Sequence, residues 1–213
     1  MATLAFIHGA GDVGWYWHLV EAELRSRGHD TLAPDLPIED DTAGLDRYAD
    51  VVVDAIGARR DVVVVGQSFG GYVAPIVAQR IRARLIVLVA GMVPLPGESA
   101  DEMFEHTGWH MAEGDTVALF YHDVPEELAR EAMSHGRRQS GTAGSEPWPL
   151  AAWPDIPTRV VIGGQDRFFP PSWLGRVVRE RLEIEPDVID GGHCPALSRP
   201  TELADLLERY LAG

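Results

Sequence analysis

Two short runs of the sequence are apolar at every position, and they restrict the possible folds more than any other feature. Residues 62–65 are four consecutive valines, and residues 85–89 are all leucine, isoleucine or valine. A strand with one face in water alternates apolar and polar residues, whereas a strand covered on both faces is apolar throughout. The two runs therefore predict central strands of a parallel sheet that has helices on both faces.

Other strand-like runs alternate with helical patterns along most of the chain. The apolar runs predict strands at residues 3–7, 31–33, 61–65, 85–89, 159–162 and 187–189. Helical periodicity predicts helices at residues 19–27, 45–56, 72–80 and 200–211. This order predicts an α/β fold in one domain over residues 1–213, a doubly wound, mostly parallel sheet of about six strands.

One long segment contains no strand-like run. Residues 94–157 are rich in proline, glycine, histidine, tryptophan and charged residues, and a helical pattern occurs at residues 125–135. A connection of this length between two core strands is far longer than an ordinary loop. We expect it to form an inserted helical lid, called the lid segment below.

Composition limits the possible partners. The formal net charge of −15 disfavours nucleic acid and anionic membrane surfaces, because both would repel the protein. No apolar run approaches the roughly 20 residues of a membrane-spanning helix, and the first residues lack a basic leader. Cys194 is the only cysteine, so no intrachain disulfide can form. We expect a cytoplasmic monomer or homodimer with a small-molecule substrate.

The first glycine-rich segment permits two interpretations. Gly9-Ala10-Gly11-Asp12-Val13-Gly14 follows the first predicted strand and matches G-x-G-x-x-G, and Asp35 lies about 20 residues further on, as in dinucleotide-binding folds. However, three bulky rings, Trp15, Tyr16 and Trp17, follow where close helix–strand packing would be needed, and the dinucleotide motif assigns no role to His8. Dinucleotide binding is therefore the weaker interpretation.

A second motif indicates nucleophilic catalysis. The third predicted strand runs into Gly66-Gln67-Ser68-Phe69-Gly70-Gly71, and a helical stretch follows. G-x-S-x-G between a strand and a helix is typical of a sharp turn that exposes a serine at the carboxyl edge of the sheet. The same turn directs the backbone N–H of Phe69 toward a developing oxyanion. The alternative is a glycine-rich turn with an incidental serine.

Two further residues could complete a catalytic triad with Ser68. Asp166 and His193 each follow a later predicted strand, and the order Ser, Asp, His is the one expected with this turn. The histidine would act as the base and the carboxylate would orient it. Asp190 is a rival carboxylate, but it lies in the loop that carries His193, so we favour Asp166. Each residue also has a structural alternative: a helix cap for Asp166 and a loop histidine for His193.

Together these segments resemble the α/β-hydrolase family, in particular its small lidded members, the plant carboxylesterases and hydroxynitrile lyases. The matching segments are Phe6-Ile7-His8-Gly9-Ala10 with Trp15 and Trp17, Gly28-His29, the Ser68 motif, Gly164-Gln165-Asp166 and Gly191-Gly192-His193. The resemblance implies acyl transfer without a cofactor and a second oxyanion donor at the N–H of Ala10. The two antiparallel strands that commonly begin this fold have no counterpart here.

Three functions remain open on the sequence. The leading hypothesis is a serine hydrolase that cleaves a small carboxylic ester through an acyl-enzyme on Ser68. A hydroxynitrile-lyase-like enzyme could use the same triad, although Gly9, Cys194 and Pro195 depart from the pattern of that subgroup. A small-molecule receptor with slow turnover could also keep the triad.

The weaker signals concern the substrate pocket and metals. We expect a pocket that includes residues near the oxyanion loop and aromatic side chains of the lid segment. The candidates are His8, Gly9, Met92, Trp109, Phe120 and Trp148. His106 and His110 are four residues apart, but Gly108 lies between them and no third ligand matches, so no metal site is expected.

Overall fold

The computed structural model describes residues 1–212. It contains one sheet of six strands in the order β2-β1-β3-β4-β5-β6, and every strand pair is parallel. The strands are β1 (Thr3–Ile7), β2 (Asp30–Leu32), β3 (Val62–Gln67), β4 (Leu85–Val89), β5 (Thr158–Gly163) and β6 (Asp187–Ile189). The predicted α/β fold with a parallel sheet of about six strands is therefore confirmed.

Helices connect successive strands and cover the sheet. They are η1 (Gly14–Trp17), α1 (His18–Ser26), α2 (Leu45–Ile56), α3 (Gly70–Ile81), α4 (Ala100–Thr107), α5 (Thr116–Phe120), α6 (Glu126–His135), α7 (Thr142–Ser145), α8 (Pro171–Leu182), α9 (Pro195–Ser198) and α10 (Pro200–Ala212). Four of the predicted ranges, 3–7, 45–56, 85–89 and 187–189, match these bounds, and the others differ by one or two residues at one or both ends. Such shifts are expected because fraying at the ends of elements is not visible in periodicity.

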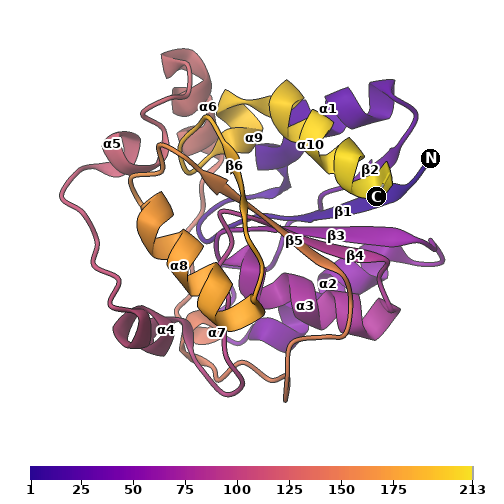
Figure 1. The fold of residues 1–213 in the computed structure, drawn as a ribbon, viewed down its shortest axis with the longest axis horizontal. Coiled ribbons are helices and arrows are strands. Elements are labelled where there is room, and N and C mark those ends of the chain that lie inside the picture. The colour runs from indigo at the N-terminus through magenta and orange to yellow at the C-terminus, as the bar shows by residue number, and fades with distance from the viewer. Residues whose placement is uncertain (213) are drawn as a thin grey trace.

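Helices pack on both faces of the sheet. α1 and α10 lie on one face, and α2 and α3 lie on the other, with α8 beside β5 (Figure 1). Strand β1 contributes to both layers, because Leu4 and Phe6 join the core under α1 and α10 while Ala5 and Ile7 join the other. The alternation shows why a central strand of this sheet must be apolar at every position.

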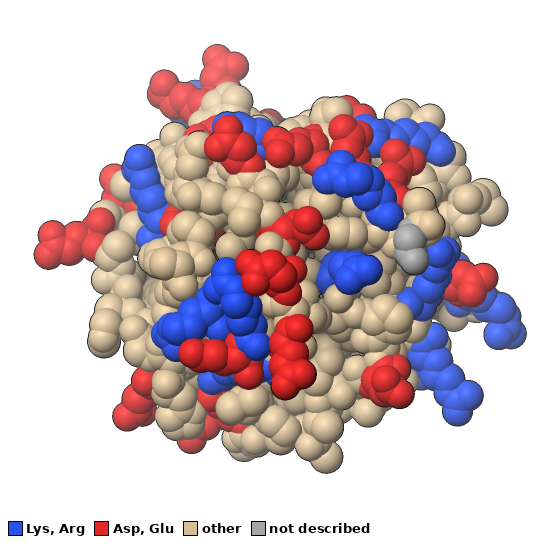
Figure 2. Space-filling view, viewed as in Figure 1, with Lys and Arg blue, Asp and Glu red and all other residues tan. Residues whose placement is uncertain are grey.

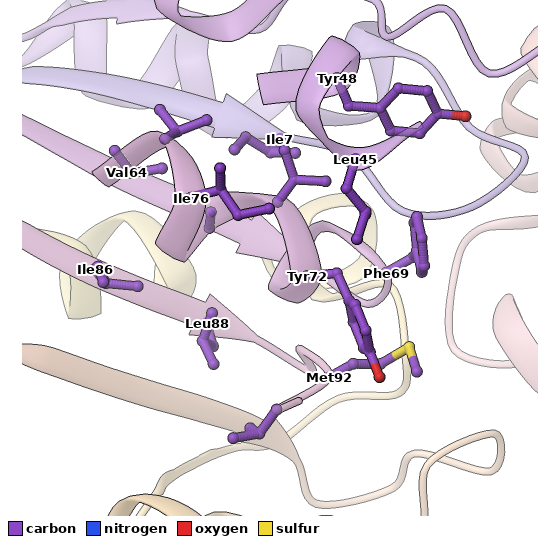
Figure 3. Packing of buried hydrophobic residues seen from close by; sticks show 14 of the residues in the cluster. Ile7, Leu45, Tyr48, Val64, Phe69, Tyr72, Ile76, Ile86, Leu88 and Met92 are labelled. Atoms are coloured by element: carbon purple, nitrogen blue, oxygen red, sulfur yellow. The ribbon is translucent and has the colours of Figure 1, made fainter. Parts of the chain in front are cut away.

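The layer on the α2 and α3 side extends to the edge of the sheet where the strands have their carboxyl ends. Figure 3 shows side chains from β1, β3 and β4 packed beside α3, with Phe69, Tyr72 and Met92 at the end of the layer. The rings of Phe69 and Tyr72 are stacked with centroids 5.5 Å apart. Residues on either side of Ser68 are thus anchored in the hydrophobic core, which restrains the loop between them.

The lid segment lies between β4 and β5 and contains α4 to α7. A buried ion pair anchors its first part, because Arg181 of α8 donates to both carboxylate oxygens of Glu98, one of them at 2.9 Å. Ser99 and Glu102 then form a reciprocal capping box at the start of α4. The helix predicted at residues 125–135 is present as α6.

Charged side chains are distributed over the surface. Figure 2 shows acidic and basic groups interspersed on the visible face, and pairs such as Arg179 with Glu185 account for part of this mixing. Within residues 1–212, no helix combines the length and apolar character that crossing a membrane requires.

Candidate active site

Ser68 lies at the apex of a strained turn between β3 and α3. Its φ of 49° is in the left-handed region, which costs energy for a residue with a side chain. Two hydrogen bonds hold the turn against β4 and the loop after it: Ser68 N–H donates to the carbonyl of Val89, and Met92 N–H donates to the carbonyl of Ser68. The backbone conformation is therefore fixed by the neighbouring strand.

Glycines flank Ser68 because the turn leaves no room for a Cβ atom. A Cβ at Gly66 would lie 2.5 Å from the carbonyl oxygen of Gly70, and one at Gly71 would lie 2.1 Å from the carbonyl oxygen of Met92. A Cβ at Gly70 would lie 2.8 Å from the carbonyl oxygen of Ile7. Contacts this short do not occur, so the two glycines of G-x-S-x-G and the adjacent Gly71 reflect three close backbone approaches.

His193 and Asp166 lie together, just past the carboxyl ends of β6 and β5. The Nδ1 atom of His193 is 2.8 Å from Oδ2 of Asp166, and both side chains are almost completely buried. The other carboxylate oxygen accepts hydrogen bonds from the N–H groups of Phe168 and Phe169, each at 2.8 Å. With Asp166 ionised, this pair places the proton on Nδ1 and leaves Nε2 as the base.

The environment of His193 keeps its Nε2 atom available for reaction. Three aromatic rings contact the imidazole edge to face, those of Phe120, Phe168 and Phe169, with centroids 5.0 to 5.2 Å away. Nε2 is buried and has no hydrogen-bond partner within residues 1–212. Ser68 and His193 line the same small cavity, and Gln67 Nε2 donates to the carbonyl of His193 at 3.3 Å. The loops that carry the serine and the histidine are therefore directly linked.

Asp190, the rival carboxylate, lies elsewhere. Its side chain is exposed and accepts a hydrogen bond from Gln165 at 2.6 Å. It thus supports the loop before Asp166, and within residues 1–212 the carboxylate paired with His193 is that of Asp166.

Two backbone N–H groups near Ser68 are free to bind an oxyanion. Neither the N–H of Ala10 nor that of Phe69 has a hydrogen-bond acceptor within residues 1–212. The two residues line one cavity together with Ser68. A Cβ at Gly9 would lie 3.1 Å from the Cβ of Ser68, so the loop after β1 is in direct contact with the serine. This arrangement suits stabilisation of negative charge beside Ser68.

His8 supports that loop from beneath. Its Nε2 accepts the N–H of Leu36 at 3.0 Å, so Nδ1 carries the proton and donates to the carbonyl of Gly9 at 2.9 Å. Burial lowers the pKa of His8 to about 4, because the charged imidazolium would lose its hydration. His8 is therefore neutral at physiological pH, and its role here is structural.

The structure also accounts for the residues of the dinucleotide-like pattern. The carboxylate of Asp35 accepts the N–H of Gly14 at 2.8 Å and pairs with Arg137 of the lid segment. The side chains of Tyr16 and Trp17 are completely buried beneath this loop. The dinucleotide-like spacing thus belongs to a glycine-rich loop that is hydrogen-bonded to the carboxylate of Asp35, just after β2.

Two cavities meet at Ser68 and Ala10. The larger has a volume of about 280 Å³. Its lining residues are mostly apolar: Ala10, Ser68, Phe69, Met92, Ala100, Asp101, Phe104, Gln139, Ser140, Gly141, Gly144, Phe168 and Phe169. The smaller has a volume of about 60 Å³ and is more polar. It is lined by Gly9, Ala10, Gly11, Asp12, Gln67, Ser68, Phe120, Tyr121, Gly136, His193 and Cys194.

Only some of the residues expected in the substrate pocket line one of the two cavities. Met92 lines the larger cavity, and Gly9 and Phe120 line the smaller one. His8 and Trp148 do not line either cavity, which corrects the prediction for them: both are buried, and the indole N–H of Trp148 donates to the carbonyl of Tyr72.

Trp109 is a further correction, because it also lies outside the lining of both cavities. Its ring packs against Phe104, Phe168 and Phe169, and its N–H donates to the carbonyl of Phe168 at 2.9 Å. Trp109 thus supports residues that do line the larger cavity. Aromatic content alone does not separate such supporting residues from lining residues.

Several polar residues of the cavities were not predicted from sequence, among them Gln139 and Asp12. Gln139 of the lid segment accepts the N–H of Gly11 at 3.2 Å, which links the lid segment to the loop after β1. Asp12 lies in the smaller cavity, and burial raises the pKa of its carboxyl group to about 6. No sequence signal marks Gln139, whereas Asp12 stands within the first glycine motif.

The histidines considered as metal ligands have other environments. His106 Nδ1 is 2.8 Å from a carboxylate oxygen of Glu98, and His110 is exposed. Within the part of the chain that the structure describes, no three histidine, cysteine, aspartate or glutamate side chains are arranged to hold a metal ion.

Comparisons with known proteins agree with this fold. A profile of the alpha/beta hydrolase family matches residues 4–206. A probable hydrolase from Phoma sp. is 29% identical over 215 residues, covering 87% of this chain and 88% of the relative. A carbendazim-hydrolyzing esterase from Nocardioides sp. is 33% identical over 150 residues, covering 60% of this chain and 62% of the relative. The crystal structure of polyneuridine aldehyde esterase has the same fold, with a TM-score of 0.85, 18% identity and 99% of each chain covered.

Proposed function

Because the chain belongs to the alpha/beta hydrolase family, we propose that it is a serine carboxylesterase whose nucleophile is Ser68. The observation that carries the proposal is the convergence of the strained Ser68, the His193–Asp166 pair and two unpaired backbone N–H groups at one edge of the sheet. Each group has the chemical character that acyl transfer requires.

The proposed reaction begins with proton transfer from Ser68 to Nε2 of His193. The serine oxygen attacks the ester carbonyl, and the resulting oxyanion accepts hydrogen bonds from the N–H groups of Ala10 and Phe69. His193 then gives its proton to the leaving alcohol, and Asp166 stabilises the imidazolium meanwhile. Water attacks the acyl-enzyme by the same steps, releases the acid and restores Ser68.

The two cavities suggest how an ester is oriented. They meet at Ser68, so the parts of the substrate on either side of the reacting carbon would occupy different cavities. The cavity of about 280 Å³ suits an extended apolar group, and the cavity of about 60 Å³ suits a group of only a few atoms. The preferred substrate is thus an ester with one large apolar part and one small part.

Labelling with a fluorophosphonate tests the proposal. Intact-mass measurement of the wild type should show one adduct, because the probe reacts with activated serines. Ser68→Ala and His193→Ala should show none, since one removes the nucleophile and the other the base. Ser140→Ala is the matched control, since this buried serine lines the larger cavity and its hydroxyl contacts Thr142.

The labelling pattern can also contradict the proposal. An adduct that persists in folded Ser68→Ala would show that another residue is the nucleophile. No adduct and no hydrolysis of any ester by the folded wild type would contradict a working triad.

A further inference from the structure

The smaller cavity contains one carboxyl group that the proposed mechanism does not use. Asp12 lies on the loop after β1, two residues beyond Ala10, and lines the cavity with Ser68 and His193. Its position places a hydrogen-bond acceptor within the volume that one end of the substrate would occupy.

Asp12 has fewer hydrogen-bond partners than the other carboxylates near the site. Its Oδ1 accepts the N–H of Val13 at 2.8 Å, and Oδ2 has no hydrogen-bond partner within residues 1–212. By contrast, Asp166 has three partners, and Asp35 is paired with Arg137 and Gly14. Within the same residues, no arginine or histidine forms an ion pair with Asp12, so one oxygen can accept a hydrogen bond from a ligand.

The groups around Asp12 add no positive charge that could replace such a partner. Burial raises the pKa values of Tyr16, Tyr121 and Cys194, so these side chains are neutral at physiological pH. Asp35 is a second negative group that acts on Asp12, and it contributes to the raised pKa of Asp12 after burial itself. The surroundings therefore favour a donor or a cation and oppose an anion.

We propose that the smaller cavity is a subsite for a hydrogen-bond-donating substrate group, a hydroxyl or a primary ammonium, and that Asp12 is the residue that selects it. This inference rests on the proposed esterase function. A volume of about 60 Å³ limits the group to a terminal hydroxymethyl or aminomethyl in size. A site whose acceptor is left unpaired by an analogue that lacks the donor discriminates against that analogue.

Matched ester pairs test the inference, because they replace a terminal hydroxyl with a methyl group of similar size. The first pair is 2-hydroxyethyl and propyl phenylacetate, which places the change in the alcohol. The second is 2-naphthyl hydroxyacetate and 2-naphthyl propionate, which places it in the acyl part. The measured quantity is the kcat/KM ratio of the hydroxyl ester to the methyl ester, in the wild type and in each variant.

The variants are Asp12→Leu, Asp12→Asn and the matched control Asp101→Asn. Asp101 lines the larger cavity, so the control removes a negative charge near the site without touching the subsite. For one of the two pairs, Asp12→Leu should lower the hydroxyl-to-methyl ratio by roughly 10-fold or more, the effect of losing a hydrogen bond to a charged acceptor. Asp12→Asn should lower it less, because its carbonyl still accepts, and Asp101→Asn should leave it unchanged. Comparing ratios between enzymes cancels intrinsic differences in ester reactivity.

A binding measurement keeps this test independent of turnover. Ser68→Ala and the double variant Ser68→Ala/Asp12→Leu are titrated with the same esters by calorimetry, and the Kd ratio should change as the kcat/KM ratio does. Unchanged ratios in folded Asp12→Leu for both pairs, with hydrolysis still dependent on Ser68, would overturn the subsite and leave the esterase function intact. If the wild type hydrolyses no ester, the esterase proposal fails, and equal or absent binding of both esters then overturns the subsite as well.

Discussion

Two titratable groups on the loop after β1, the buried His8 and the partly buried Asp12, should make the unfolding free energy depend on pH in opposite directions. His8 is neutral in the folded protein, and its pKa is lowered to about 4. Between that value and the ordinary histidine pKa of about 6.5, the unfolded chain binds a proton at this position and the folded protein does not. The contribution of His8 is therefore complete above about pH 6.5 and is lost as the pH falls toward 4.

The size of the His8 contribution follows from the difference between its pKa values in the folded and unfolded chain. A difference of about 2.5 pH units at about 1.4 kcal/mol per unit corresponds to about 3 kcal/mol of unfolding free energy. His8 is only 1% exposed, so solvent screens little of this effect. Protonation would also turn the Nε2 atom into a donor facing the N–H of Leu36, which breaks that hydrogen bond.

The shifted pKa of Asp12 changes the unfolding free energy with pH in the opposite direction. Its pKa is raised from 3.8 to about 6, so between these values the folded protein binds the proton and the unfolded chain does not. Stability from this group is fully present below about pH 3.8 and is lost as the pH rises through about 6. The difference again corresponds to about 3 kcal/mol, so the two groups nearly cancel in the wild type.

Single variants should separate the two effects. Urea unfolding, followed by tryptophan fluorescence, gives the unfolding free energy of the wild type, His8→Gln and Asp12→Asn from about pH 7 to about pH 4. The stability advantage of the wild type over His8→Gln should shrink by about 3 kcal/mol as the pH falls. The stability of the wild type relative to Asp12→Asn should rise by a similar amount. Differences that are constant with pH in both variants would refute the assigned charge states.

Three further predictions concern the triad, the turn and the lid segment. Asp166→Asn should keep the fold but lower kcat by roughly 10³- to 10⁴-fold, as measured with a chromogenic ester, because the orienting carboxylate is lost. Gly66→Ala should lower the unfolding free energy, measured in urea, by about 1–3 kcal/mol, because its Cβ would lie 2.5 Å from the carbonyl oxygen of Gly70. Unchanged stability would contradict this close approach. Arg181→Met should destabilise the protein by roughly 3–5 kcal/mol, because Glu98 is left buried without its cation, and Glu98→Gln in the same chain should recover part of the loss.

Local sequence patterns were sufficient for the fold class and for the order of the catalytic groups. The four valines at residues 62–65 predicted a strand buried on both faces, and the glycines around Ser68 mark backbone approaches that leave no space for a Cβ atom. Asp166 and His193 could be located because parallel strands place their carboxyl ends at one edge of the sheet. Each of these inferences depends on neighbours in sequence or on the symmetry of the sheet.

Tertiary structure alone decided which side chains line the cavities. Trp148 and Phe120 are both aromatic residues of the lid segment, yet one is bonded to Tyr72 in the core and the other faces His193. The sequence also determined that a carboxyl group lies in the loop after β1, at Asp12. Its isolation from any cation depends on the packing of distant segments, because Arg137 pairs with Asp35 instead. Charge pairing and cavity shape are set by contacts between residues far apart in the chain, and no local periodicity encodes them.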